Sequence, residues 1–283
     1  MSSAILQDSP RLVFVLGMHR SGTSAVTRAL PVVGVDIGSH HLARFDNPRG
    51  FFENPDFVHL NEALLDSCGL DWESVQRPTK ADVSRLLTSN FVSAGRAFLA
   101  SFTGRARVVG LKDPRLCRLL PFWLPLCAAD GIDVTCLIVL RAPHLVAASL
   151  QKRDHMPLSK AHALWTAYTT DALLCTRTVP RLLLSYDRLL DQTHRELVRL
   201  AHFLSLPLSS EEEVRFSREF LQKNLRHHTK NDRTACTEQV SSSLYMRLEP
   251  CTECLTSDLL DSARMTHALL KASSSVYDSL SNG

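Results

Sequence analysis

Two segments of the chain carry residue types that could bind and transfer an anionic group. In the first, residues 12–24 read LVFVLGMHRSGTS, an apolar run that leads into a segment bounded by Gly17 and Gly22. Glycine permits backbone torsions that other residues avoid, so the amides between these glycines can turn inward around an anion. The hydroxyls of Thr23 and Ser24 would add donors at the start of a following helix. The pattern predicts a phosphate-binding loop between a strand and a helix.

The glycine spacing matches that of nucleoside-triphosphate-binding loops, which continue with lysine and then serine or threonine after the second glycine. Here Thr23 stands at the lysine position, so Arg20 is the remaining cation inside the loop. Kinases and GTPases use that lysine together with magnesium to neutralise the transferred phosphoryl group. The absence of that lysine favours a reaction other than phosphoryl transfer. An ordinary glycine turn between a strand and a helix is the alternative without a binding function.

A second candidate anion site follows a later apolar run, residues 134–140. Arg141 comes directly after that run, and Ser149 follows eight residues later in a predicted helix. Parallel strands of an open α/β sheet end at one edge, so both side chains can face the crevice beside the first loop. Each residue alone could equally be an ordinary surface or packing residue. Together they indicate an anion site, because the predicted phosphate-binding loop precedes them in the chain.

These segments resemble the P-loop sulfotransferases, in particular a bacterial branch whose phosphosulfate loop reads GMHRSGTS. The resemblance spans most of the chain and includes DNPRGFFENP at 46–55, LKDPRL at 111–116 and VLRAPHLVAASL at 139–150. It implies 3′-phosphoadenosine 5′-phosphosulfate (PAPS) as the donor, adenosine 3′,5′-bisphosphate as the product, and no metal. By resemblance, Arg141 and Ser149 bind the 3′-phosphate. The 5′-phosphosulfate would be held by the side chains of Arg20, Thr23 and Ser24 together with the backbone amides of Met18, His19, Arg20, Ser21, Gly22, Thr23 and Ser24.

Two carboxylates are candidates for the base that takes the proton of an acceptor hydroxyl. Glu53 follows the first predicted strand and helix, and related enzymes with an arginine in the loop use a glutamate from this neighbourhood. Asp113 leaves a predicted strand end, where other branches place a histidine. Lys112 beside it could stabilise the sulfonate, as could Arg20. Either carboxylate could instead cap the helix that follows it.

The rest of the chain supplies elements that could position these residues. Apolar, β-favouring runs occur at 12–16, 108–111, 134–140 and 182–185. Amphipathic stretches separate them, at 23–33, 55–68, 81–102, 143–153, 159–177 and 186–204. This alternation predicts an α/β fold, with a P-loop NTPase-like parallel sheet flanked by helices. We expect a single sulfotransferase-like domain over residues 1–283, with its core at about 10–205.

A helical C-terminal extension is expected at about 206–283, because 211–224 and 255–270 have helical periodicity. Between them, the polar segment 226–243 is expected to form a loop or lid. Arg226, His227 and His228 in this segment could close over the donor, although a basic stretch in a loop is commonly solvated surface. Acceptor specificity is expected in the segments 34–51, 70–103 and 153–157.

Composition limits the class of partner. Charged residues make up 22% of the chain and the net charge is +3, so no charge excess points to nucleic acid or a membrane surface. We therefore expect a small-molecule or glycan acceptor. No apolar stretch reaches the roughly 20 residues that span a bilayer, and the first ten residues are polar, which favours a cytoplasmic protein.

The cysteines are expected to be buried thiols. Cys251 and Cys254 form a C-x2-C pair that lacks a second pair of zinc ligands nearby. Two other functions stay open at this point. One is a nucleotide-dependent phosphotransferase, and the other is a catalytically silent nucleotide-binding protein.

Overall fold

A parallel sheet forms the centre of the protein. The computed structural model describes residues 9–39, 52–219, 236–250, 261, 263–266 and 268. The strands in this part of the chain are β1 (Arg11–Leu16), β2 (Val108–Lys112), β3 (Asp133–Leu140) and β4 (Arg181–Ser185). Each begins and ends within one residue of its predicted position. Apolar runs between turn residues are reliable markers of buried parallel strands, because both faces of such strands are covered.

The strand order places several loops at one edge. It is β2-β1-β3-β4, and all neighbouring strands are parallel. Val15 pairs with Lys112 and Leu16 pairs with Ile138, so β1, β2 and β3 end close together. The chain leaves β1 toward β2 but leaves β3 toward β4, on the opposite side. The boundary between β1 and β3 is therefore the switch point at which open α/β sheets bind ligands.

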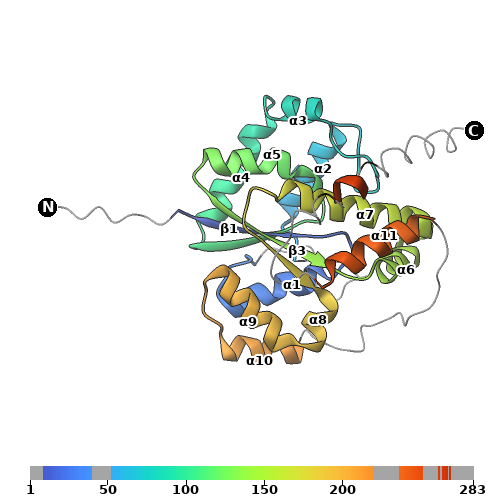
Figure 1. The fold of residues 1–283 in the computed structure, drawn as a ribbon. Helices are drawn as coiled ribbons and strands as arrows, with labels where there is room; N and C mark the ends of the chain where they lie inside the picture. The colour runs from blue at the N-terminus through green and yellow to red at the C-terminus, as the bar shows by residue number, and fades with distance from the viewer. Residues whose placement is uncertain are drawn as a thin grey trace, which may run out of the picture.

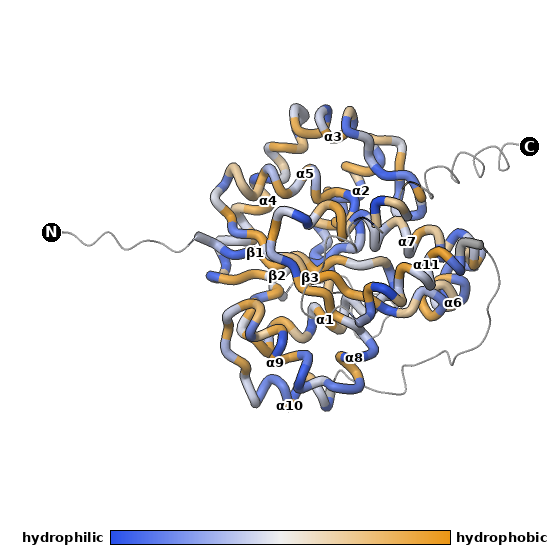
Figure 2. Tube along the Cα trace, viewed as in Figure 1, coloured by the Kyte–Doolittle hydropathy of each residue, from blue (hydrophilic) through white to orange (hydrophobic). Residues whose placement is uncertain are grey.

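Helices cover both faces of the sheet (Figure 1). One face of β1, with Phe14 at its centre, packs against α2 (Pro55–Asp66), α4 (Phe91–Thr103), α5 (Leu116–Ala129) and α7 (Leu158–Cys175). The other face, with Val13 and Val15, packs against α1 (Thr23–Ala29), η1 (Leu30–Val33) and α9 (Thr193–Leu204). Figure 2 shows hydrophobic residues along the strands and hydrophilic ones along the outer helix α10 (Ser210–Glu219). The predicted α/β fold is confirmed.

The remaining described helices are α3 (Lys80–Leu86), α6 (Pro143–Asp154), α8 (Tyr186–Asp191) and α11 (Cys236–Leu248). No helix among the described residues is long and apolar enough to cross a membrane.

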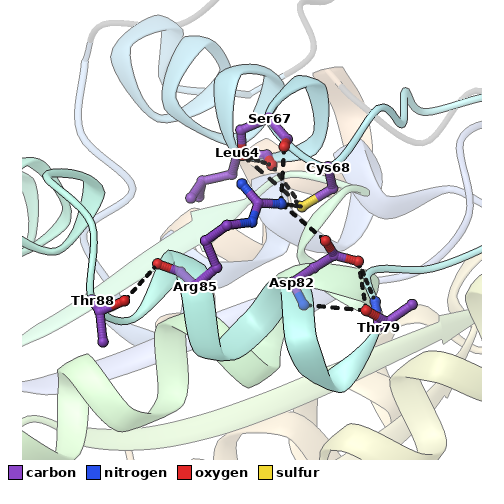
Figure 3. A network of polar contacts seen from close by, with 7 residues as sticks. All are labelled: Leu64, Ser67, Cys68, Thr79, Asp82, Arg85 and Thr88. Carbon is purple, nitrogen blue, oxygen red and sulfur yellow. Dashed lines mark hydrogen bonds and ion pairs between the residues drawn. The ribbon is translucent and has the colours of Figure 1, made fainter.

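Side-chain contacts hold α3 against the end of α2 (Figure 3). Arg85 donates to the Ser67 carbonyl at 3.0 Å and to the Asp82 carboxylate at 2.9 Å. Thr79 and Asp82 form a capping box at the start of α3. Hydrogen bonds from Thr79, with a further one from Arg85, hold the pKa of Asp82 at about 2. These contacts fix the two ends of the segment 67–79, part of which reaches the candidate site.

Three predicted helices end earlier or divide. The predicted helix 23–33 ends at Ala29 and continues as the 3₁₀ turn η1, which contains Pro31. The range 81–102 is two helices, because α3 ends at Leu86; after it, the Ser89 hydroxyl donates to the Leu86 carbonyl at 2.7 Å and accepts the Phe91 amide at 3.2 Å. The range 186–204 is also two helices, with a turn at Gln192. Periodicity continues across such short breaks, so it does not reveal them.

The prediction of a loop at 226–243 was wrong for its last part. Residues 236–243 belong to α11, which packs on α6 and α7. Only a narrow face of α11 is buried, including Ser241, Leu244 and Leu248, so its sequence looks polar. The segment 226–228 lies outside the described residues. The range of α5 was not predicted, because Pro121 and Pro125 lie inside it and proline normally disfavours helix interiors.

Candidate anion-binding active site

The glycines of the loop after β1 are required by its geometry. Gly17 has a φ of 147°, and a Cβ atom there would lie 2.8 Å from the Val139 carbonyl oxygen. Gly22 has a φ of 91°, and its Cβ would lie 2.2 Å from Cδ2 of Tyr186. At both positions, a residue with a side chain would require the surrounding structure to rearrange. The loop is therefore closely packed between β3 and the start of α8.

A buried thiol holds the start of the loop. The Gly17 amide donates to Cys117 Sγ at 3.2 Å, and Cys117 is fully buried. Burial raises the pKa of this thiol, so it stays protonated and unreactive. Cys127 and Cys136 are buried as well, whereas Cys68 and Cys175 are partly exposed, so the expectation of buried thiols holds only in part.

Several polar groups of the loop are available for a ligand. The amide of Ser21 donates to the Met18 carbonyl at 3.1 Å, whereas those of Gly22 and Thr23 donate to no acceptor within the described residues. The Ser21 hydroxyl is buried and also lacks a partner there. Buried polar groups are normally hydrogen-bonded, so this group of donors indicates a place for an anion. The Met18 side chain is in the core, which leaves its backbone as the part that can contribute.

Arg20 connects the loop to the second predicted anion site. It has a φ of 69°, an uncommon value for a residue with a side chain. Its Nε donates to Ser149 Oγ of α6 at 2.8 Å. Arg141, the first residue after β3, donates from Nη1 to the Arg20 carbonyl at 3.1 Å. Residues predicted from separate motifs thus meet at the switch point.

Arg141 is held through both its side chain and its backbone. Its guanidinium lies over the Tyr186 ring, with Cζ 5.0 Å from the ring centre. The Arg141 carbonyl accepts the Trp165 indole N–H at 3.1 Å. Its Nε is buried and has no hydrogen-bond partner within the described residues. Sequence reasoning missed Tyr186, although it is the first residue after β4 and stands where Arg141 stands after β3.

Glu53 and Lys112 form a buried ion pair at the same edge of the sheet. Lys112 Nζ lies 2.5 Å from Glu53 Oε1, and both side chains are more than nine-tenths buried. Lys112 is the last residue of β2, next to β1. The helix cap of α2 is Asn54, whose side chain accepts the amides of Asp56 and Phe57. Glu53 is therefore not the N-cap of α2, which was the alternative role considered from the sequence.

Asp113 is fully buried and its oxygens are already engaged. Oδ2 accepts Asn61 Nδ2 at 2.9 Å, and Oδ1 accepts the amide and Nη1 of Arg115 at 2.9 and 3.1 Å. Arg115 also donates to Glu62 at 2.7 Å. These bonds occupy three of the roughly four lone-pair sites of the carboxylate, and the side chain is fully buried, so Asp113 is poorly placed to accept a proton from an acceptor hydroxyl. The geometry favours Glu53 over Asp113 as the base.

We expect Asp113→Asn to lower the free energy of unfolding by more than it lowers the free energy of ligand binding. The change removes the charge that Arg115 faces inside the protein, and breaking a buried pair typically costs about 3–5 kcal/mol. Urea unfolding followed by tryptophan fluorescence measures the loss. Asp66→Asn, at an exposed position near the end of α2, serves as the control and should stay within about 0.5 kcal/mol of the native protein. An equal effect of both changes would contradict the structural role of Asp113.

The His19 ring packs against aromatic side chains from two other segments of the chain. Its ring centre is 4.7 Å from that of Trp72 and 6.2 Å from that of Tyr168. Arg153, at the end of α6, lies over the Trp72 ring at 5.5 Å. Two of the three segments expected to determine specificity, 70–103 and 153–157, therefore meet beside the loop.

Several positions named in the sequence analysis lie outside the described residues: most of the segment 34–51, Cys251 and Cys254. Within the described part of the chain, no group of three or more His, Cys, Asp or Glu side chains could hold a metal ion.

No family model matches the chain, and no curated protein compared with it matches either. Some solved structures are similar. The sulfotransferase domain of an olefin synthase from Synechococcus PCC 7002 is 16% identical, with 93% of this chain and 96% of that chain covered and a TM-score of 0.47. A sulfotransferase domain from the curacin biosynthetic pathway is 14% identical, with coverage of 93% and 98% and a TM-score of 0.45.

A sulfotransferase of Mycobacterium tuberculosis is 14% identical, with coverage of 78% and 74% and a TM-score of 0.42. At this level of similarity, the functional conclusion has to come from the site of this chain itself.

Proposed function

We propose that the protein transfers a sulfuryl group from PAPS to a hydroxyl of a carbohydrate or small-molecule acceptor. The observation that carries this proposal is the contact between the two anion-binding elements. Arg20 Nε lies 2.8 Å from Ser149 Oγ, and Arg141 Nη1 lies 3.1 Å from the Arg20 carbonyl. PAPS carries negative charge on both sides of one ribose, so it requires two neighbouring cationic sites. The switch point between β1 and β3 offers such a pair.

The residues present fit this donor. Ser21 Oγ and Arg141 Nε are buried polar atoms without a hydrogen-bond partner in the described part of the chain. A bound phosphosulfate and phosphate would provide acceptors for them. We assign the loop amides, Arg20 and Ser21 to the 5′-phosphosulfate. Arg141 and Ser149 are assigned to the 3′-phosphate, which ATP lacks.

When bound, PAPS supplies a sulfuryl group that is already joined to a phosphate leaving group. The role of Lys112 and Arg20 is to stabilise negative charge on the sulfonate and the departing phosphate. Glu53 accepts the acceptor's proton while the new S–O bond forms and the S–O bond to the phosphate breaks. The ion pair at 2.5 Å supports this assignment, because it keeps a carboxylate and an ammonium together inside a buried site.

A phosphotransferase that uses ATP is the competing enzyme class. It would need a lysine after the second glycine, and Thr23 stands there instead. Thr23 is buried, with 3% of its surface exposed, and its side chain carries no charge that could replace that lysine. This observation favours the sulfuryl donor over a nucleoside triphosphate.

Calorimetry with adenosine 3′,5′-bisphosphate, ATP and AMP tests the proposed function. We expect binding of the bisphosphate that does not depend on magnesium, together with much weaker binding of ATP and AMP. The two 5′-phosphorylated controls isolate the contribution of the 3′-phosphate. Preferential ATP binding that requires magnesium would overturn the proposal.

We expect Arg141→Ala to weaken bisphosphate binding by about one to two decades, because a charge-assisted contact is worth roughly 1.5–3 kcal/mol. The same calorimetry measures the change. Arg195→Ala, at an exposed position of α9 on the other face of the sheet, is the matched control. An affinity that is the same in both variants would remove Arg141 from the site.

A further inference from the structure

The side chain of His19 has no assigned role, although it belongs to the phosphate loop. Arg20, its neighbour, reaches Ser149 of α6. The His19 ring instead packs against Trp72, at 4.7 Å, and Tyr168, at 6.2 Å. These contacts hold the ring in one place. Its Nε2 atom is buried and has no hydrogen-bond partner within the described residues.

The support behind this ring is itself rigid. The Tyr168 hydroxyl donates to the Trp72 carbonyl at 2.7 Å. Arg118, which is fully buried, lies 4.2 Å from the Tyr168 ring centre and donates to the carbonyls of Ser74 and Gln76. The Trp72 loop is therefore tied to α5 and α7. A histidine held this firmly, with an unpaired buried nitrogen, is arranged to meet a group that the described part of the chain does not contain.

The charged groups around His19 are mainly cations. They come from the loop, from β2 and the turn after it, and from α6: Arg20, Lys112, Arg115 and Arg153. Burial and then these cations lower the pKa of His19 well below its ordinary value of 6.5. Three of the cations have carboxylate partners, namely Glu53, Asp113 and Asp154. These carboxylates only partly offset the cations. Burial and the cations together keep the imidazole neutral near pH 7 in the free protein.

We propose that the His19 side chain is a ligand of the donor's anionic group, neutral in the free protein and protonated once that anion is bound. This rests on the proposed function, because it requires the loop to bind a phosphosulfate or phosphate. An anion beside Arg20 and Lys112 offsets the charges that keep the imidazole neutral, and a nearby negative charge favours its protonated form. Nε2 then becomes a charge-assisted donor to the anion.

This arrangement couples binding to proton uptake from the solvent. Since protonation accompanies anion binding, the contribution of His19 to the affinity rises as the pH falls from about 7.5 toward 6, where histidine titrates. The ligand's own phosphates give an effect of the opposite sign, because they take up protons in the same range when free. The contribution of the His19 side chain is therefore measured as the difference in the pH dependence of the affinity between the native protein and a His19 variant.

The test is calorimetry of adenosine 3′,5′-bisphosphate binding at several pH values, in buffers of different ionisation enthalpy. It compares the native protein with His19→Gln, whose amide can still form a neutral hydrogen bond but cannot be protonated. The exposed His202→Gln on α9 is the matched control. We expect the native protein and the control to take up as much as about one proton more than His19→Gln, which should also bind about tenfold less tightly at pH 6.

Three results would overturn the inference. If the bisphosphate binds and His19→Gln shows the native proton uptake and pH dependence, His19 is not protonated by the ligand. If His19→Gln has lost its fold by circular dichroism, a histidine NMR titration of the native protein replaces it, and a resonance whose pKa does not rise on binding rejects the proposal. If the native protein binds no bisphosphate, the proposed function fails and this inference fails with it.

Discussion

Turnover should fall by about 10²- to 10⁴-fold in Glu53→Gln, while the affinity for adenosine 3′,5′-bisphosphate changes little. Glutamine keeps the size of the side chain and can still hydrogen-bond Lys112, but it cannot accept the proton of an acceptor hydroxyl. The measurement is the release of bisphosphate from PAPS with a panel of sugar and phenol acceptors. Because the bisphosphate has no sulfuryl group, its affinity reports on donor binding alone.

A second Lys–Glu pair provides the control for this variant. Glu73 lies 2.7 Å from Lys160 at a partly exposed position, so Glu73→Gln also removes one partner of such a pair. Its turnover should remain close to native. The assignment would be contradicted if Glu53→Gln kept most of its activity while Asp113→Asn, compared at equal folded concentration, lost it. That pattern would make Asp113 the base.

The second large effect is expected for Gly22→Ala. The new Cβ would lie 2.2 Å from Tyr186 Cδ2, and the backbone φ of 91° is itself unfavourable for alanine. Either the loop or the Tyr186 ring must move, and the ring carries the Arg141 guanidinium at 5.0 Å. Both predicted phosphate sites would therefore be disturbed. We expect bisphosphate affinity to fall by at least about tenfold, which corresponds to roughly 1.4 kcal/mol.

Gly34→Ala separates the clash from the backbone effect. Gly34 also has a positive φ, of 78°, but a Cβ there would meet no atom within 4 Å. This variant should lose about 1–2 kcal/mol of stability through its backbone alone and should bind the bisphosphate normally. Thermal unfolding and calorimetry of both variants give the comparison. Equal bisphosphate affinities would show that Gly22 does not need to be glycine for ligand binding.

Local patterns were sufficient to predict the framework of the site. The run 12–24 predicted a strand, a glycine loop and a helix, and the structure has β1, the loop and α1 in these places. The position of Arg141 was also predictable, because it directly follows the apolar run 134–140 and parallel strands end at one edge of the sheet. Such features depend on residues close together in the chain, which is why sequence alone can reveal them.

The choice between the two carboxylates was not accessible in this way. Asp113 accepts a hydrogen bond from Asn61, and Glu53 is paired with Lys112; both partners are more than 50 positions distant in the chain. Nothing in the residues adjacent to Glu53 or Asp113 indicates these contacts. The helix α11 was missed for a related reason, since its few buried residues become recognisable only once α6 and α7 are there to cover them.

By itself, the sequence determined that a glycine-bounded turn follows a buried strand, that cations stand beside it, and that parallel strands carry both. Tertiary structure decided which charged side chains are paired and which polar atoms have no hydrogen-bond partner among the described residues. Arg115 engages Asp113, Lys112 engages Glu53, and the His19 ring is left with a buried nitrogen that has no partner in the described part of the chain. The reason is physical: burial and charge act through space over a few ångströms, whatever the separation of the residues along the chain.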